Sequence, residues 1–467
     1  MPPLAFETRQ IHAGQTPDAV TGSRALPIHQ TTSFVFPSAT SAADRFALAE
    51  QGPIYSRLGN PTVEVVEDRI ADLEGGVGAV LLSSGQSALT LAILTLAGPG
   101  DHIVASAALY GGSRNLLDVT LRRLGIETTF IEDPSDVEAW RAATRPTTTA
   151  FFGEAVANPQ SIVLDIAAVA DIAHEVGVPL IVDSTATTPF LLRPLEHGAD
   201  IVLHSATKFL GGHGTAIGGV VVDGGTFDFG RDPDRFPGFN EPDDSYNGIV
   251  YARDLGPTSP FGANVSFGIK LRVQLLRDIG ACISPFNAFL IAQGLETLSL
   301  RMERHVANAR AVASWLEERD AVASVSYAGL ASSPSAELVE RYLPRGVGAV
   351  VGFELRDGYD AAVAFVDALE LHSHVANIGD VRSLVIHPAS TTHAQLDAEA
   401  QRSAGVGPGF IRLSVGLEGI DDILADLEVG FAAAAAVTGA TSEGDGSRRS
   451  GPVGTEPGPD AVGASAP

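Results

Sequence analysis

Lysine is nearly absent from this 467-residue chain: Lys208 and Lys270 are the only two, and arginine supplies the other 28 of the 30 basic residues. Arginine can replace lysine at most surface positions, but not where chemistry requires an amine that loses its proton. A lysine retained in such a chain is therefore a candidate for covalent chemistry. The alternative is that two lysines survived by chance, so their neighbours in the sequence must decide.

Cysteine, positive charge and long apolar runs are also scarce. The single cysteine, Cys282, excludes an internal disulfide and a cysteine-rich metal site. A formal net charge of -26 argues against nucleic acid or an anionic membrane as a partner. No apolar run reaches the roughly 20 residues of a membrane span. The first residues lack the basic and apolar segments of a signal peptide, so we expect a soluble cytoplasmic protein.

Changes in composition divide the chain into four parts. Prolines punctuate residues 1–60, which we predict to be an extended N-terminal arm. Residues 61–285 are predicted to form a large α/β domain, interrupted by a Gly/Pro/Phe/Asp-rich insertion at 224–262 that is functional, disordered or an interface element. Residues 286–432 are predicted to form a smaller C-terminal α/β domain. Residues 433–467 are predicted to be a disordered tail.

Short apolar runs alternate with helical patterns in the large domain. Residues 62–74 predict an amphipathic helix that begins at Pro61 and ends before Gly75. Two further helices are predicted at 288–304 and 306–318. The alternation predicts a mainly parallel central sheet flanked by helices. The predicted strands are 79–82, 102–105, 128–131, 150–152, 179–183, 201–203 and 219–222.

Residues at the ends of these strands suggest a site for pyridoxal phosphate, which needs a lysine, an anion cradle, an acid near its ring nitrogen and a platform for its ring. Lys208 follows the strand 201–203 and is preceded by the hydroxyls of Ser205 and Thr207. Asp183 ends an apolar strand, where pairing with a protonated ring nitrogen would satisfy its charge. An Asp that only caps the following turn is the alternative.

The cradle and the platform are predicted from two further turns. Gly85 and Gln86 lie in Ser83-Ser-Gly-Gln-Ser-Ala88, where backbone N–H groups at a helix start could hold a phosphate. Tyr110 follows another strand and could stack on the cofactor ring, although a core tyrosine is the alternative. The four elements together are far more specific than any one of them.

The chain resembles the Cys/Met-metabolism family of fold-type I enzymes that depend on pyridoxal phosphate, from about Phe6 to Phe431. Within the family it resembles most closely the group of O-acetylhomoserine sulfhydrylases. The segments that carry the resemblance are Phe6-Glu-Thr-Arg-Gln-Ile-His-Ala-Gly-Gln15, Tyr55-Ser-Arg-Leu-Gly-Asn-Pro-Thr62, Ser83-Ser-Gly-Gln-Ser-Ala88 and Ser205-Ala-Thr-Lys208. Small departures occur at Ala157, where an acid is usual, and at Ser184, where an Asn is usual.

The resemblance implies a role for each of these residues. Lys208 would be the Schiff-base lysine, Asp183 the partner of the ring nitrogen and Tyr110 the ring platform, and Asn158 would contact the ring hydroxyl. Phosphate contacts are implied for Gly85, Gln86, Ser205 and Thr207. Tyr55 and Arg57 would reach into the neighbouring subunit, which makes a homodimer with shared active sites the smallest active unit and a homotetramer the expected assembly.

Arg412 is the predicted substrate residue, because an arginine inside the apolar run Phe410 to Val415 could fork an α-carboxylate. A surface salt bridge is the alternative. The resemblance makes Arg412 the carboxylate clamp, assisted by Ser383, and implies that Tyr55 also contacts the substrate. Four histidines, His372, His374, His387 and His393, fit no metal signature by their spacing, so no metal is expected.

Two segments distinguish between members of the family. Arg382 stands where cystathionine enzymes usually carry Glu, and residues 236–251 resemble an insertion of the sulfhydrylases. The expected reaction is γ-replacement, in which O-acetyl-L-homoserine and sulfide or methanethiol give homocysteine or methionine and acetate. The alternatives are an O-succinylhomoserine sulfhydrylase, a cystathionine γ-synthase or γ-lyase, and a non-catalytic protein that binds pyridoxal phosphate.

Overall fold

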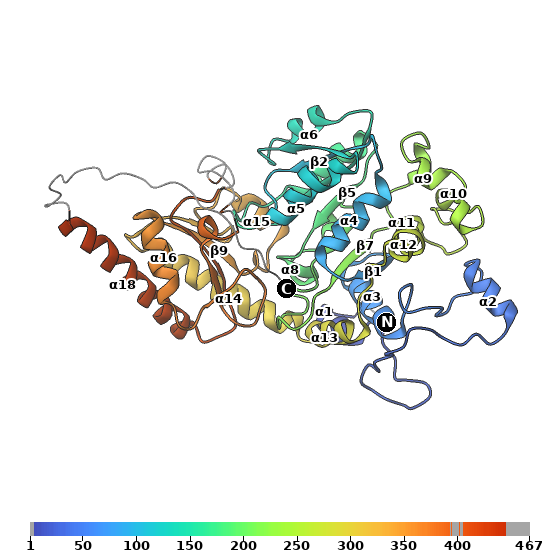
Figure 1. The fold of residues 1–467 in the computed structure, drawn as a ribbon, viewed down its shortest axis with the longest axis horizontal. Coiled ribbons are helices and arrows are strands. Elements are labelled where there is room, and N and C mark those ends of the chain that lie inside the picture. Colours follow the sequence, from blue (N-terminus) through green and yellow to red (C-terminus); the bar gives the residue numbers. More distant parts are fainter. Residues whose placement is uncertain (1–3, 393, 395–400, 402–404, 445–467) are drawn as a thin grey trace, which may run out of the picture.

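The computed structural model describes residues 4–392, 394, 401 and 405–444, and two sheets organise this part of the chain (Figure 1). All seven predicted apolar runs form strands of the first sheet, which confirms the predicted α/β class. Its strands are β1 (Gly78–Leu82), β2 (His102–Ser106), β3 (Glu127–Ile131), β4 (Thr148–Glu154), β5 (Leu180–Asp183), β6 (Ile201–His204) and β7 (Gly219–Asp223).

The first sheet has the strand order β1-β7-β6-β5-β4-β2-β3. Strand β7 runs antiparallel to both of its neighbours and the other pairs are parallel, so the sheet is mainly parallel as predicted. Alternate residues of β1 enter different cores: Leu81 belongs to one cluster, and Val80 and Leu82 to the other. Both faces are therefore buried, as a sheet covered by helices on each side requires.

Helices cover the two faces of this sheet (Figure 1). The predicted helix at 62–74 is observed as α3 (Pro61–Glu74), with Asn60 capping its start and Gly75 in a left-handed conformation at its end. The other helices of this part are α4 (Gly85–Leu96), α5 (Gly111–Asn115), η1 (Leu116–Leu121), α6 (Val137–Ala143), α7 (Ile166–Glu175), α8 (Thr188–Leu191), η2 (Pro194–His197), α11 (Ser266–Lys270), η5 (Leu271–Leu276) and α12 (Arg277–Ile279).

The insertion at 224–262 folds into short helices around a phenylalanine cluster, so the expectation that it could be disordered is wrong. Phe229 and Phe239 stack with ring centroids 4.1 Å apart, and Phe236 meets Phe229 edge-on at 5.3 Å. Because aromatic rings bury large apolar areas, they supply the core of a segment that contains no strand. Its helices are η3 (Phe229–Arg231), α9 (Pro237–Asn240), η4 (Asp244–Tyr246) and α10 (Tyr251–Asp254).

The second sheet has five strands in the order β10-β11-β12-β9-β8. Two long helices lead into it, and the break between them lies at Glu296 and Thr297, not near His305 as predicted. Its strands are β8 (Val322–Ser326), β9 (Val350–Leu355), β10 (Ser373–His374), β11 (Leu384–Ile386) and β12 (Phe410–Ser414). Its helices are α13 (Pro285–Leu295), α14 (Leu298–Glu317), α15 (Ala336–Tyr342), α16 (Gly358–Ala368), η6 (Pro388–Ser390) and α18 (Ile420–Gly444).

Both ends of the described chain contain helices in addition to irregular segments. The arm contains α1 (Phe6–His12) and α2 (Ala39–Phe46), which are joined by irregular chain that projects from the body in Figure 1. At the other end α18 continues to Gly444, so the prediction of disorder from Ala433 is wrong for the first part of that tail. A run of alanines has high helix propensity, which explains the continuation. Residues 445–467 lie outside the described part.

Candidate active site

A cavity of about 260 Å³ brings together most of the predicted site residues. It lies where the carboxyl ends of β4, β5 and β6 meet the start of α4, as expected for a ligand site of an open α/β sheet. The second sheet contributes Arg412 from β12 and a loop that contains Asn377. The predicted residues that line the cavity are Gly85, Gln86, Tyr110, Asn158, Asp183, Ser205, Thr207, Lys208 and Arg412.

Lys208 presents a partly desolvated amine to this cavity. Its Nζ donates a hydrogen bond to Asn377 Oδ1. Burial and the nearby Arg412 guanidinium lower the pKa of Lys208 to about 8, because both disfavour a second positive charge. An ordinary lysine, with a pKa near ~10.4, is almost entirely protonated at pH 7. Lys208 is therefore suited to act as a nucleophile and a base.

Asp183 ends β5 with a half-buried side chain. Thr185 N donates to Asp183 Oδ1 at 2.9 Å. Burial nevertheless raises the pKa of the Asp183 carboxyl group, so a cation beside it would be strongly favoured. A protonated pyridine nitrogen is such a cation, and the acid fits the role predicted for it.

The start of α4 has the geometry that the predicted anion cradle requires. The Ser84 hydroxyl caps the helix by accepting a hydrogen bond from Ser87 N at 3.1 Å. A Cβ at Gly85 would lie 2.7 Å from Ser205 Cβ, so only glycine allows this approach. The hydroxyl of Thr207 is bonded to the backbone of Gly218. Backbone N–H groups at the helix start can therefore face an anion between these two segments.

Tyr110 and Asn158 stand at the mouth and the wall of the cavity. The Tyr110 ring is about half exposed, so the alternative of a core tyrosine is wrong; its role as a ring platform stays a prediction. A Cβ at Gly112 would lie 2.5 Å from its Cε1, which shows how closely the ring lies over the following turn. Asn158 Oδ1 accepts a hydrogen bond from Arg412 Nη1 at 3.3 Å.

Arg412 is a buried guanidinium, with 9% of its surface exposed. Its Nη2 donates to Asn377 O at 3.2 Å, and burial lowers its pKa to about 10. Among the residues that the structure describes, no carboxylate forms a salt bridge with it, so the alternative of a surface salt bridge is wrong. A buried cation without an anion is well suited to bind a substrate carboxylate.

Three predicted residues do not line this cavity. The Ser383 hydroxyl donates to Glu418 Oε2 at 2.9 Å and accepts from Gly416 N at 2.9 Å, so its assistance to Arg412 is not direct. Tyr55 and Arg57 lie on the arm, with Arg57 Cζ 5.0 Å from the Tyr55 ring centroid. Their predicted place is in a neighbouring subunit, which stays a prediction.

The prediction from sequence missed several residues of the cavity, among them the polar residues Glu154, Thr185 and Asn377. Glu154 is the last residue of β4, just as Asp183 is the last of β5, so an acid at a strand end was the available signal. Thr185 Oγ1 accepts from Ser205 N at 2.8 Å. Asn377 comes from a loop of the second sheet, and nothing in its local sequence marks it.

Lys270 and the histidines belong to other surroundings. Lys270 donates to Gln274 Oε1 and lies 4.9 Å from the Tyr251 ring centroid, away from the cavity of Lys208. Within the described residues no group of three or more His, Cys, Asp and Glu could hold a metal ion; His393 lies outside them. No helix in the described part of the chain is long and apolar enough to cross a membrane.

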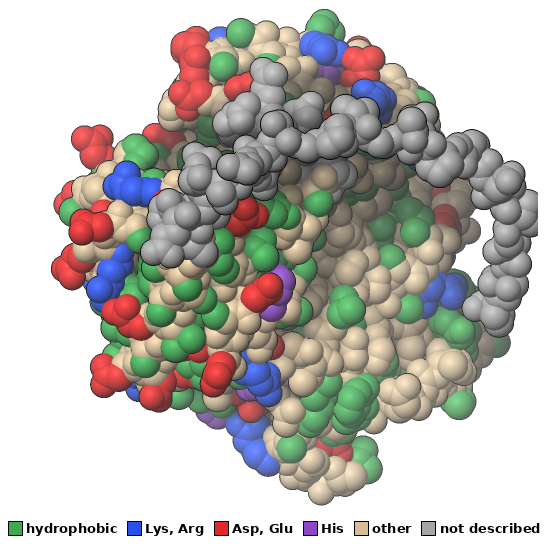
Figure 2. Space-filling view, turned by 60° about the vertical axis from the view of Figure 1, so that its left-hand side comes forward, with side chains coloured by type: hydrophobic (Ala, Val, Ile, Leu, Met, Phe, Trp, Pro, Cys, Tyr) green, Lys and Arg blue, Asp and Glu red, His purple; other side chains and the backbone are tan. Residues whose placement is uncertain are grey.

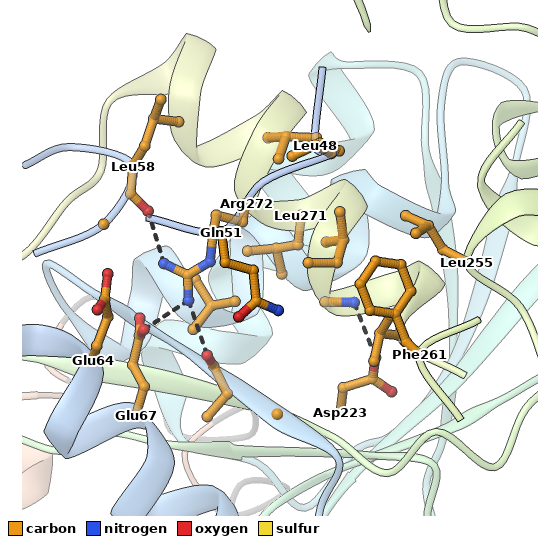
Figure 3. Close-up of a pocket in the computed structure, with 18 of the residues that line it drawn as sticks. Leu48, Gln51, Leu58, Glu64, Glu67, Asp223, Leu255, Phe261, Leu271 and Arg272 are labelled. Atoms are coloured by element: carbon orange, nitrogen blue, oxygen red, sulfur yellow. Dashed lines mark hydrogen bonds and ion pairs between the residues drawn. The ribbon is translucent and has the colours of Figure 1, made fainter. Parts of the chain in front are cut away.

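A larger cavity of about 500 Å³ lies between the arm and the first sheet (Figure 3). Arg272 points into it and is held by Glu67 Oε2 at 2.7 Å and Leu58 O at 2.8 Å. None of the predicted site residues lines it. Chemistry, not size, therefore identifies the smaller cavity as the candidate active site.

Comparison with known proteins agrees with this geometry. The family model described as Cys/Met metabolism PLP-dependent enzyme matches residues 7–432. The chain belongs to this family. It is 56% identical over 431 residues to the O-acetyl-L-homoserine sulfhydrylase of Corynebacterium glutamicum, covering 92% of this chain and 97% of that one. It is 51% identical to the homocysteine synthase of Schizosaccharomyces pombe, covering 90% and 96%.

A solved structure of the same family supports both the fold and the cofactor. A Campylobacter jejuni protein assigned as an O-acetylhomoserine (thiol)-lyase superposes with a TM-score of 0.86 at 38% identity, covering 92% of this chain and all of that one, and carries N'-pyridoxyl-lysine-5'-monophosphate. The cofactor of this Cys/Met-metabolism enzyme is pyridoxal phosphate. The half-buried Asp183, the glycine-containing start of α4 and the partly desolvated Lys208 fit it.

Proposed function

We propose that this enzyme catalyses γ-replacement on O-acetyl-L-homoserine, in which sulfide displaces acetate from Cγ and L-homocysteine is released. The observation that carries the proposal is a partly desolvated lysine amine beside a buried arginine in one cavity. That arginine forms no salt bridge with any residue that the structure describes. The two curated relatives named above are an O-acetyl-L-homoserine sulfhydrylase and a homocysteine synthase. Methanethiol in place of sulfide would give methionine.

Each polar group of the cavity has a proposed task in binding. Lys208 holds pyridoxal phosphate, Asp183 faces its ring nitrogen and Tyr110 supports its ring. Asn158 contacts the ring hydroxyl, while Arg412 binds the α-carboxylate of the substrate. The phosphate contacts are assigned to Gly85, Gln86, Ser205 and Thr207. Bound pyridoxal phosphate supplies an electron sink for negative charge at Cα.

Lys208 is the proposed acid and base of the reaction. With a pKa of about 8, roughly a tenth of the free amine is neutral at pH 7 and can take the proton from Cα. The resulting ammonium can return that proton to a neighbouring carbon. Arg412 fixes the carboxylate, so Cα stays within reach of Nζ during these transfers.

Two features favour a sulfhydrylase over a cystathionine enzyme. Arg382 is two-thirds exposed and pairs with Asp380 Oδ1 at 3.0 Å. A cation at this loop is unfavourable for a second substrate amino group, whereas Glu would attract one. The second feature is the insertion itself, because residues 236–251 resemble an insertion typical of the sulfhydrylases. An O-succinylhomoserine sulfhydrylase is the nearest alternative, because Arg382 could bind a succinyl carboxylate.

A homodimer with shared active sites, assembled as a homotetramer, is the second part of the proposal, together with a cytoplasmic location. Apolar side chains of the arm support self-association, because Val20 and Val35 are more than nine-tenths exposed and Phe46 is about half exposed. Such side chains are normally covered. Tyr55 and Arg57 lie on the same arm, so the proposal places them at the partner's cofactor.

Steady-state kinetics test the proposed reaction. We expect kcat/KM for O-acetyl-L-homoserine with sulfide to exceed that for O-succinyl-L-homoserine with sulfide by about ten-fold or more, a difference of ~1.4 kcal/mol in transition-state binding. L-cysteine in place of sulfide is the control for cystathionine formation and is expected to react poorly. A preference for the succinyl ester, or cystathionine as the main product, would contradict the proposal.

A further inference from the structure

Two carboxyl groups, not one, stand at the end of the central strands. Glu154 and Asp183 are paired in register at the carboxyl ends of the parallel strands β4 and β5, and both line the cavity. Residues paired across parallel strands point to the same face of the sheet. The proposed mechanism uses Asp183 and leaves Glu154 without a role.

The contacts of Glu154 connect two segments of the cofactor site. Its Oε1 accepts a hydrogen bond from Tyr110 N at 2.6 Å, and its Oε2 accepts one from Asn158 N at 3.3 Å. Tyr110 follows β2 and Asn158 follows β4, so one side chain fixes the backbone of both. Glu154 is 8% exposed, so the short hydrogen bond from Tyr110 N is shielded from water and its loss is costly.

The charge of Glu154 is as informative as its contacts. Burial and the neighbouring Asp183 carboxylate raise the pKa of Glu154 to about 8, so without a cation nearby most of this group is protonated at pH 7. Two adjacent buried carboxylates repel each other unless a cation lies near them. A protonated ring nitrogen beside Asp183 supplies that cation, and it favours ionisation of Glu154 when the cofactor is bound.

We propose that Glu154 is a positioning residue of the cofactor site, which holds Tyr110 and Asn158 around the ring and adds a second negative charge beside Asp183. This inference rests on the roles proposed above for Tyr110, Asn158 and Asp183. It does not require the substrate to be O-acetyl-L-homoserine, because every measurement below reports the bound cofactor.

Cofactor binding to the apoenzyme is the first test. We expect Glu154→Gln to raise the dissociation constant of pyridoxal phosphate about ten-fold or more. The amide nitrogen of Gln would face one of the two backbone N–H groups, and that group would lose its acceptor. Glu354→Gln is the matched control: Glu354 also accepts a backbone hydrogen bond, from Gly409 N at 2.9 Å, but lies outside the cavity. Equal binding by Glu154→Gln and wild type would overturn the proposal.

The spectrum of the bound cofactor separates positioning from a purely structural role. Removal of a negative charge near the ring disfavours its protonated form, so the pH at which the yellow absorbance is lost should fall by about half a unit or more in Glu154→Gln. The Glu354→Gln control should keep the wild-type midpoint. An unchanged midpoint in Glu154→Gln would mean that Glu154 only supports the loops, which also overturns the proposal.

A double-mutant cycle tests whether Glu154 acts through Tyr110. In the double variant Glu154→Gln/Tyr110→Ala, the fold-loss in cofactor affinity should be clearly smaller than the product of the two single fold-losses. The reason is that each substitution alone already removes the positioned Tyr110 ring. Fully independent losses would contradict action through Tyr110. If Glu154→Gln does not fold, Glu154→Asp serves instead, because its shorter carboxylate cannot reach both N–H donors; wild-type affinity in that variant would also overturn the proposal.

Discussion

At the scale of single residues, the two lysines show how surroundings decide chemistry. Both amines are buried enough to have a lowered pKa. Lys270 lies over the rings of Tyr251 and Phe239, at 4.9 and 5.4 Å, and near the Asp243 carboxylate, all of which favour its charged form. Lys208 has Arg412 as its charged neighbour, which disfavours that form. The surroundings of Lys270 therefore suit a structural cation, and those of Lys208 suit the base that we propose.

At the scale of elements, the loop that carries Asn377 joins the second sheet to the lysine loop. Gly379 has φ +75° and would place a Cβ 2.7 Å from Phe209 N and 3.0 Å from Lys208 C. Val381 N donates to Gly212 O at 2.9 Å. The backbone of Lys208 is therefore packed against the same loop that contacts its amine and Arg412.

A glycine pair tests the importance of this packing. Gly379→Ala should lower the free energy of unfolding by about 2–4 kcal/mol and reduce turnover strongly. Two costs are summed here, the backbone strain at a positive φ and the clash of the new Cβ with the loop that carries Lys208. Gly358→Ala is the control: Gly358 has φ +76° but open space around it, so only the strain of about 1 kcal/mol is expected. Urea unfolding and kcat/KM measure both effects; equal losses in the two variants would show that the close approach is unimportant.

The elements also show what sequence can predict. All seven strands of the first sheet were predicted, because buried parallel strands are continuous apolar runs between Gly and Pro signals. The break near Glu296 was missed because α13 and α14 form nearly one helical pattern. Lys208 and Asp183 were found from their strand ends. Asn377 depends on packing between the two sheets, which local sequence does not encode.

At the scale of the whole molecule, acidic side chains and exposed apolar side chains are distributed differently over the surface. Acidic side chains are scattered over the left side of Figure 2, among hydrophobic ones, as expected for a formal net charge of -26. Such a charge keeps a protein soluble and disfavours nucleic acid as a partner. The arm, by contrast, exposes apolar residues such as Val35, which suits a contact with a second copy of the chain.

Mixed dimers test whether active sites are shared. Subunits with Arg57→Ala and with Arg412→Ala are each expected to be nearly inactive alone. In a mixed dimer one site has its own Arg412 and its partner's Arg57, so random mixing should restore about a quarter of wild-type activity if the interface is two-fold symmetric. Arg412→Ala mixed with Lys208→Ala is the control and should not recover, since every site lacks one of its own residues. Absence of recovery in the first mixture would contradict shared sites.

The most direct test of the central claim uses the scarcity of lysine. The purified holoenzyme is reduced with borohydride, which fixes pyridoxal phosphate permanently to the amine that holds it, and the digested peptides are analysed by mass spectrometry. Because Lys208 and Lys270 are the only lysines of the chain, a side-chain amine that carries the group can belong to only one of these two residues. The account predicts a pyridoxyl phosphate group on Lys208 and an unmodified Lys270. Modification of Lys270, or of neither lysine, would contradict it.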